Sequence, residues 1–456
     1  METNKQPIIG YLPNERPAWG RLILFAFQQI LVMFPATVLV ALLTGFHIST
    51  TIFASGFATL CFILITKGKI PLFYGSSFSY IAAIVGITAV QNFGDIAPDN
   101  LIGQAQFGII LSGLVSIAAG LIITRFGPEK IEKVLPPVVT GPIAMIIGLS
   151  LAGTALTQAA GYSAGTGSQA ASWIVALITL VAILFLTVIL KKGVLSQLPL
   201  LLGIGIGYVV AIVATYVFGA GLIDFSGVFA QAVITVPHFT LPIPSWTAVF
   251  AIMPIALATI PESTAHLYQL DLYVNNLARE KGAKPYPIAD KLGINLIGDG
   301  VGDMVSALVG GPAGTNYGEN ISTMAITKNF SIWVLGAAAI ITMILSFFTP
   351  LANLISTIPS AVMGGASVYL FGVIGAQGIA IMIEKKVNLF SAKNLGIIAV
   401  ILVIGIGGAY GFPNGSIEIF GAHLPAIATA SIVGILLNIL LSLAEKIGTK
   451  PVKKTE

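Results

Sequence analysis

Charged side chains are scarce in this chain of 456 residues: Asp, Glu, Lys and Arg make up 9% of it, and hydrophobic residues 56%. Soluble domains carry about 25% charged residues, so the composition excludes an ordinary soluble protein. The mean hydropathy of +0.95 and repeated apolar runs of about 20 residues predict many transmembrane helices in a lipid bilayer. The net charge of +4 therefore gives no reason to expect nucleic acid as a partner.

Cysteine is almost absent as well. The single cysteine, Cys61, lies in an apolar run, which excludes an intrachain disulfide and suits a structural thiol. Enzyme motifs are also missing: the sequence shows no Gly-rich phosphate loop with its Lys, no His-Glu-x-x-His pattern and no Cys/His metal cluster. We therefore expect no enzymatic activity, no ATP-driven pump, no cofactor and no metal.

The apolar segments predict an all-α polytopic membrane protein with about fourteen spans. Two of them, the third and the tenth, are too short to cross alone, so each is expected to combine a short extended strand with a half-helix. The expected segments are 20–44, 48–66, 78–92, 104–124, 136–157, 171–190, 195–219, 246–270, 289–309, 318–328, 331–349, 360–382, 394–410 and 423–444.

The distribution of charge fits this count. With fourteen segments and a cytoplasmic N-terminus, all 22 Lys and Arg residues fall in cytoplasmic stretches. The external loops contain no Lys or Arg, although they contain acidic residues such as Asp95 and Asp99. Basic residues mark the cytoplasmic side. The sequence therefore predicts a cell-membrane protein with both termini in the cytoplasm. Asp271 and the basic run around Arg279 are interpreted as part of a cytoplasmic loop.

An internal repeat is visible. Seven segments fall in residues 1–240 and seven in 241–456, and the interrupted third segment of each half corresponds: Lys69–Phe78 matches Gly310–Glu319. An odd number of helices per half makes the two halves inverted in the membrane. Paired broken helices in an inverted repeat predict a substrate site near the membrane midplane.

Glu319 begins the expected half-helix of the tenth segment. An acid suits any helix start, but a carboxylate at membrane depth indicates a functional site. Its neighbours Tyr317 and Asn320 fit either the site or ordinary packing and capping. Phe78, at the other half-helix start, could cover the face of a flat ligand or simply pack in the core.

Glu262 and His266 are four residues apart and therefore share one helix face. At membrane depth such a pair fits a proton relay, or alternatively a hydrogen-bonded pair that only joins helices. Asp299 and Asp303 are either solvated near a helix end or support the site, and we favour support.

At these residues the chain resembles the nucleobase–ascorbate transporter family, and within it the bacterial uracil permeases. The matching stretches are Gly75-Ser-Ser-Phe78, Tyr317-Gly-Glu-Asn-Ile321 and Val362-Met-Gly-Gly365. The resemblance implies a fourteen-helix inverted repeat with a core domain (segments 1–4 and 8–11) and a gate domain (segments 5–7 and 12–14). It also implies proton-coupled uptake at a site between the domains, and commonly a homodimer.

By motif position, the resemblance makes Glu319 and Glu262 the substrate-binding carboxylates, places Phe78 and Gly318 at backbone contacts, and makes His266 the proton-coupling histidine. We also expect Tyr317 to bind substrate and Glu262 to take part in proton coupling. The sequence departs from the pattern at several positions. Gln28-Gln29 stands where uracil permeases usually have Gln-His, Pro261 precedes Glu262, Ser-Thr-Ala precedes His266, and Asn316 stands where threonine is common.

The sequence thus predicts a secondary transporter that imports a nucleobase, with uracil favoured, together with protons. One alternative is a purine or xanthine permease of the same family. Another is an anion exchanger or channel, against which the two carboxylates argue. A membrane-embedded receptor or enzyme is disfavoured because catalytic motifs and a soluble domain are missing.

Overall fold

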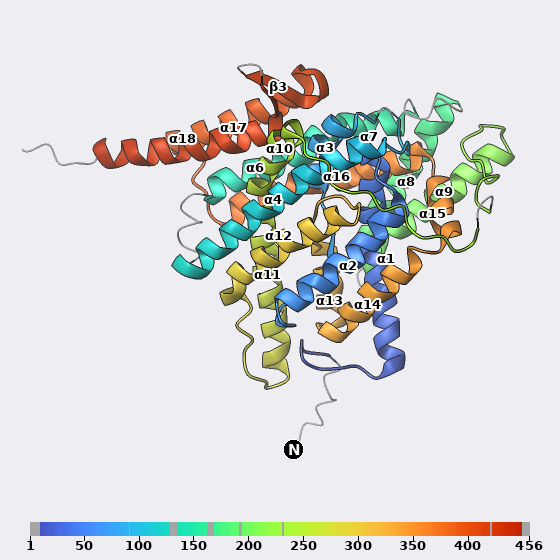
Figure 1. The fold of residues 1–456 in the computed structure, drawn as a ribbon, viewed down its shortest axis with the longest axis horizontal. Coiled ribbons are helices and arrows are strands. Elements are labelled where there is room, and N and C mark those ends of the chain that lie inside the picture. The colour runs from blue at the N-terminus through green and yellow to red at the C-terminus, as the bar shows by residue number, and fades with distance from the viewer. Residues whose placement is uncertain are drawn as a thin grey trace, which may run out of the picture.

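The computed structural model describes residues 10–90, 92–127, 135–161, 168–190, 194–229, 232–419 and 422–448, and helices dominate it (Figure 1). The helices of the first half are α1 (Trp19–Thr44), α2 (Ile48–Ile65), η1 (Phe78–Tyr80), α3 (Ile81–Thr88), α4 (Asp99–Phe126), α6 (Pro137–Ser150), α7 (Ala152–Ala159), α8 (Gln169–Ile189), η2 (Val194–Gln197) and α9 (Pro199–Tyr216).

The second half contains α10 (Trp246–Ile252), η3 (Met253–Ile255), α11 (Ala256–Glu280), η4 (Ala289–Lys291), α12 (Leu292–Leu308), α13 (Gly318–Thr327), α14 (Ile332–Leu345), α15 (Thr349–Ser356), α16 (Ser360–Glu384), α17 (Ala392–Gly411), η5 (Pro413–Gly415) and α18 (Ala426–Gly448). Two short antiparallel strand pairs accompany them: β1 (Tyr74–Ser76) with β2 (Gly314–Asn316), and β3 (Ser416–Ile419) with β4 (Ala422–Pro425).

Within the described residues, ten helical stretches are long and apolar enough to cross a membrane, whereas Phe78–Thr88 and α14 are apolar but shorter. The chain is therefore a multi-pass membrane protein. A total of fourteen membrane crossings is reached only if short helices such as α3 and α13 each form part of a crossing. The number of fourteen therefore stays a prediction. The terminal residues 1–9 and 449–456, expected in the cytoplasm, lie outside the described residues.

One expected boundary lies further along the chain. Asp271 and Arg279 belong to α11, which continues to Glu280, and their cytoplasmic location stays a prediction. The Oδ1 atom of Asp271 accepts hydrogen bonds from the backbone N–H groups of Ile288 (3.1 Å) and Ala289 (2.9 Å). Asp271 thus fastens the connection after α11 to the side of that helix.

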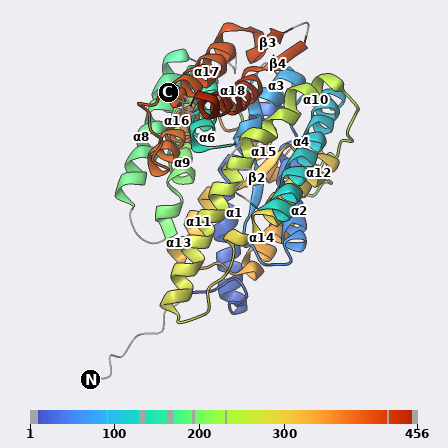
Figure 2. The same cartoon turned by 90° about the vertical axis from the view of Figure 1, so that its left-hand side faces the viewer.

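The helices pack in two groups, which Figure 2 shows side by side. In one group α4 packs against α12 and α2 against α14, with α1 alongside; in the other α16 packs against α6 and α8, and α17 against α6 and α18. Glycines allow the closest approaches. A Cβ on Gly300 of α12 would lie 2.3 Å from the carbonyl oxygen of Gly113 in α4, so the two backbones touch, as at membrane interfaces built from small residues.

The strands β1 and β2 form the centre of the first group. Tyr74 pairs with Asn316, Gly75 with Thr315 and Ser76 with Gly314. Because the pair is antiparallel, η1 and α3 leave one end of the ladder and α13 leaves the other. The N-terminal ends of both half-helices therefore lie at the ladder. The extended strands and half-helices expected from the sequence are present.

Candidate functional site

Glu319 is the second residue of α13, directly after the buried strand β2. Its side chain is exposed, although Tyr317 before it and Asn320 after it are buried, with relative exposures of 4% and 0%. Glu319 is therefore accessible to water while Tyr317 and Asn320 are packed inside the protein. The first backbone N–H groups of a helix have no partner within the helix, and those of α13 lie beside Glu319, where a ligand could accept from them.

Glu262 of α11 faces the other half-helix. The Oγ atom of Ser79, in η1, donates a hydrogen bond of 3.3 Å to its Oε2 atom. Glu262 and Glu319 are also close enough to repel one another electrostatically. The structure therefore brings together the two carboxylates that the sequence predicted as site residues, although 57 positions separate them along the chain.

His266 lies one turn after Glu262 and reaches the start of α13. A Cβ on Gly318 would lie only 2.9 Å from the Nε2 atom of His266, so a glycine is needed for this approach. The Nδ1 atom of His266 is buried and has no hydrogen-bond partner in the described part of the chain. A buried polar atom without a partner is costly.

Phe78 joins the site to the second helix group. Its ring meets that of Phe371 in α16 edge to face, with 5.9 Å between the centroids. It also packs against hydrophobic clusters on both sides, one built on α1 and α11 and one on α8 and α16. The half-helix start at Phe78 therefore lies at the boundary between the groups.

Tyr317 and Asn320 hold the broken segment in place. The hydroxyl of Tyr317 donates to the carbonyl oxygen of Ser76 (2.9 Å) and also contacts the Oγ1 atom of Thr37 (2.9 Å). The amide of Asn320 donates to the backbone oxygen (3.0 Å) and the side-chain oxygen (2.7 Å) of Gln29 in α1. With these bonds made, the geometry favours a positioning role for both residues.

The two buried aspartates of α12 sit behind the ladder. The Oδ1 atom of Asp303 accepts hydrogen bonds from the Tyr74 hydroxyl (2.6 Å) and from the Gly314 backbone N–H (2.8 Å), and so clamps β1 to β2. Asp299 accepts a hydrogen bond from the Ser263 hydroxyl next to Glu262. Both aspartates are buried, so they are not solvated near a helix end; their support of the substrate site stays a prediction.

Ser263 connects three elements in a small polar network. Its Oγ atom donates to Asp299 and accepts from the side-chain amides of Asn295 (2.7 Å) and Asn316 (3.2 Å). Ser263 and Asn316 are two of the positions where the sequence departs from the usual pattern, and here they bond to each other. Sequence reasoning missed Ser79, Asn295 and Phe371, because single polar or aromatic residues in apolar segments give no pattern.

A second polar cluster lies away from these residues. His47, Asp99 and His238 each offer a ligand atom, all within 4.8 Å of one another. The sequence predicted no metal site, and no motif spacing could have revealed this one, because the three residues come from widely separated segments.

Comparisons with known proteins decide the family. A model described as the permease family matches residues 20–414. The chain belongs to this permease family. The uracil permease of Bacillus caldolyticus is 40% identical over 434 residues, which cover 94% of each chain. That of Bacillus subtilis (strain 168) is 36% identical over 433 residues, covering 92% of this chain and 93% of the relative. This permease is therefore a transporter and not an enzyme.

Solved structures agree on the fold of this permease. The transmembrane domain of the cyanobacterial bicarbonate transporter BicA matches with a TM-score of 0.60 at 16% identity, covering 92% of this chain and 97% of that one. The murine anion transporter Slc26a9, in its inward-facing state, gives 0.64 at 14% identity, covering 95% and 69%. At such low identity the likeness concerns the fold alone.

We expect Tyr74→Phe to destabilise the permease by about 1–3 kcal/mol, because it leaves a buried carboxylate with one hydrogen bond fewer. Tyr216→Phe is the matched control, because Tyr216 is 63% exposed on α9, and it should change stability by less than about 0.5 kcal/mol. Unfolding in detergent measures both. Equal stability of the two variants would show that Asp303 does not hold the ladder.

Proposed function

We propose that this permease imports uracil by proton symport. The observation that carries the proposal is that Glu262 and Glu319 approach one another beside the N-terminal ends of the two half-helices. The relatives named uracil permease, at 36–40% identity over nearly the whole chain, support uracil as the substrate.

The chemistry of the site suits this ligand. Uracil is flat and neutral, with two N–H donors and two carbonyl acceptors. Carboxylates accept hydrogen bonds from N–H groups, and the free N–H groups of a helix start donate to carbonyl oxygens. In this proposal Glu319 and Glu262 receive the N–H groups, the backbone at Gly318 and Phe78 binds the carbonyls, and the Phe78 ring covers one face. Tyr317 positions the strand beside them.

Proton coupling is assigned to His266 and Glu262. They lie one turn apart on α11, and His266 also touches the start of α13 through Gly318. A proton taken up by either group changes the charge next to the substrate-binding carboxylate. Binding of proton and substrate would then be linked, as symport requires.

We further propose that the two helix groups are the core and gate domains of an inverted repeat. The packing supports this: α4 with α12 and α2 with α14 each join one helix from either half of the chain. The pairs α8 with α9 and α17 with α18 likewise correspond between the halves. Phe78 against Phe371 marks the boundary, where relative movement of the groups would expose the site to one side at a time.

The basic residues support a cytoplasmic location for one end of the molecule. Lys281 pairs with Glu15 (2.5 Å), and Lys328 with Glu280 (2.5 Å), so the N-terminal region, the end of α11 and the end of α13 lie together. Lys and Arg mark the cytoplasmic side. The opposite end, where His47, Asp99 and His238 meet, is then external. A homodimer remains part of the proposal on family resemblance alone.

Competition for uptake tests the substrate. In cells that lack other uracil transporters, labelled uracil should enter through this permease. Unlabelled uracil and 5-fluorouracil should compete strongly, because both keep two N–H groups and two carbonyls. Thymine should compete less well because of its methyl group, and uridine poorly because its ribose blocks N1.

Two outcomes would support other substrates. Xanthine that competes better than uracil would show that the site accepts a purine. Uptake of labelled bicarbonate that unlabelled uracil does not reduce would favour the anion exchanger that the sequence left as an alternative. Empty-vector cells give the background.

Replacing His266 tests the coupling. We expect His266→Ala to impair uptake driven by a pH gradient in proteoliposomes more than counterflow exchange, because exchange needs no net movement of protons. His423→Ala, which changes the histidine of β4, should leave both unchanged. Equal losses in the two assays would mean that His266 is structural.

A further inference from the structure

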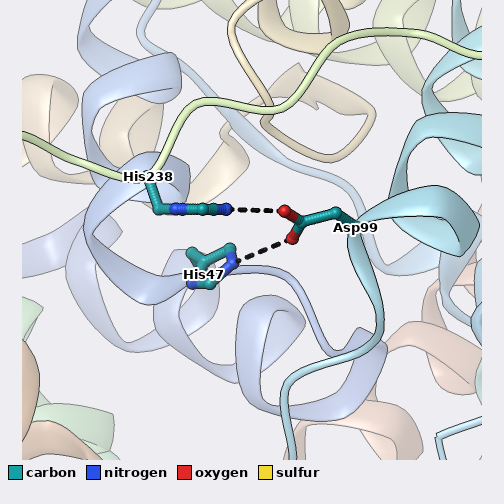
Figure 3. A group of neighbouring side chains, drawn as sticks. All are labelled: His47, Asp99 and His238. Atoms are coloured by element: carbon teal, nitrogen blue, oxygen red, sulfur yellow. Dashed lines mark hydrogen bonds and ion pairs between the residues drawn. The ribbon is translucent and has the colours of Figure 1, made fainter.

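His47, Asp99 and His238 converge from three separate segments, as Figure 3 shows. His47 precedes α2, Asp99 is the first residue of α4, and His238 lies in the linker between α9 and α10. The Nε2 atom of His238 is 2.9 Å from Oδ2 of Asp99, and that of His47 is 3.8 Å from Oδ1. Both rings thus point at opposite oxygens of one carboxylate.

One of these atoms lacks a partner. The Nε2 atom of His47 is buried and makes no hydrogen bond in the described part of the chain, since 3.8 Å is too long for one. An imidazole nitrogen is a common ligand atom for metal ions, and His47 Nε2 has no other group to bind among the described residues.

The linker around His238 is hydrogen-bonded to α2 and α4. The carbonyl oxygen of His238 accepts a hydrogen bond from Thr50 Oγ1 (2.7 Å). Two residues on, Thr240 exchanges hydrogen bonds of 3.0 Å with the side chain of Gln106 in α4. These hydrogen bonds fix the backbone at His238, and they keep its side chain near His47 and Asp99.

We propose that His47, Asp99 and His238 form a binding site for Zn²⁺ or a similar transition-metal ion. The bound ion would join the linker between α9 and α10 to the N-terminal ends of α2 and α4. Two imidazoles and a carboxylate, with water as a fourth ligand, are a common zinc donor set. Magnesium and calcium prefer oxygen ligands and fit it poorly.

The geometry needs only a small adjustment. Tetrahedral zinc with bonds of about 2.0–2.1 Å places its ligand atoms about 3.4 Å apart, whereas here all three lie within 4.8 Å. The Asp99 and His238 side chains are 60% and 54% exposed and are free to close on an ion. The ion would also satisfy His47 Nε2.

Thermal unfolding with Zn²⁺ tests the site independently of transport. The full-length permease, purified in detergent with any histidine tag removed and stripped with chelator, is heated with and without ZnCl₂. We expect Zn²⁺ to raise the melting temperature and MgCl₂ to leave it unchanged, because an ion that binds only the folded state stabilises it.

Three variants locate the effect. His238→Gln and Asp99→Asn should lose the Zn²⁺ shift, with zinc affinity by calorimetry reduced more than about tenfold. Asp95→Asn, which changes an exposed carboxylate on the same connection before α4, should keep it. The proposal is wrong if the unmodified protein shows neither shift nor binding heat, if His238→Gln responds equally, or if Mg²⁺ acts as strongly as Zn²⁺.

Discussion

The hydrogen-bonded ladder between β1 and β2 is the feature on which the rest of this structure depends. Backbone that leaves the helical path inside a membrane must find its hydrogen bonds within the protein. Here each broken segment supplies them to the other, and the Asp303 carboxylate joins the two strands through Tyr74 and Gly314. Only with this pairing can two helices begin in the interior of the protein.

The ladder also positions the residues of the proposed site. The exposed side chain of Glu319 is held at the start of α13 by the Tyr317 and Asn320 bonds. Glu262 reaches the opposite half-helix through Ser79, and Phe78 touches the second helix group through Phe371. The same fold occurs in anion transporters at 14–16% identity, so the fold by itself does not choose the ligand. In the proposed site, the two carboxylates Glu262 and Glu319 would favour a neutral ligand with N–H groups over an anion.

Much of this was predictable from sequence because the signals are strong and local. Apolar runs give the helix positions, and Gly and Pro before Glu319 and Phe78 give the broken segments. The i, i+4 spacing places Glu262 and His266 on one face. Contacts between distant segments were not predictable: nothing in the sequence pairs Gln29 with Asn320, Ser263 with Asn316, or His47 with His238. The connection expected to begin at Asp271 begins after Glu280, because polar residues alone do not end a helix.

Calorimetric binding of uracil to purified Glu319→Gln is the most direct test of the central claim. Glutamine keeps the size of the side chain but replaces a charged acceptor oxygen by an amide donor. A hydrogen bond to a charged group contributes about 1.5–3 kcal/mol, so the affinity should fall about 10- to 150-fold. Glu418→Gln, at an exposed position of β3, should bind as the unmodified permease does. Unchanged affinity in folded Glu319→Gln would contradict the account and place the substrate elsewhere.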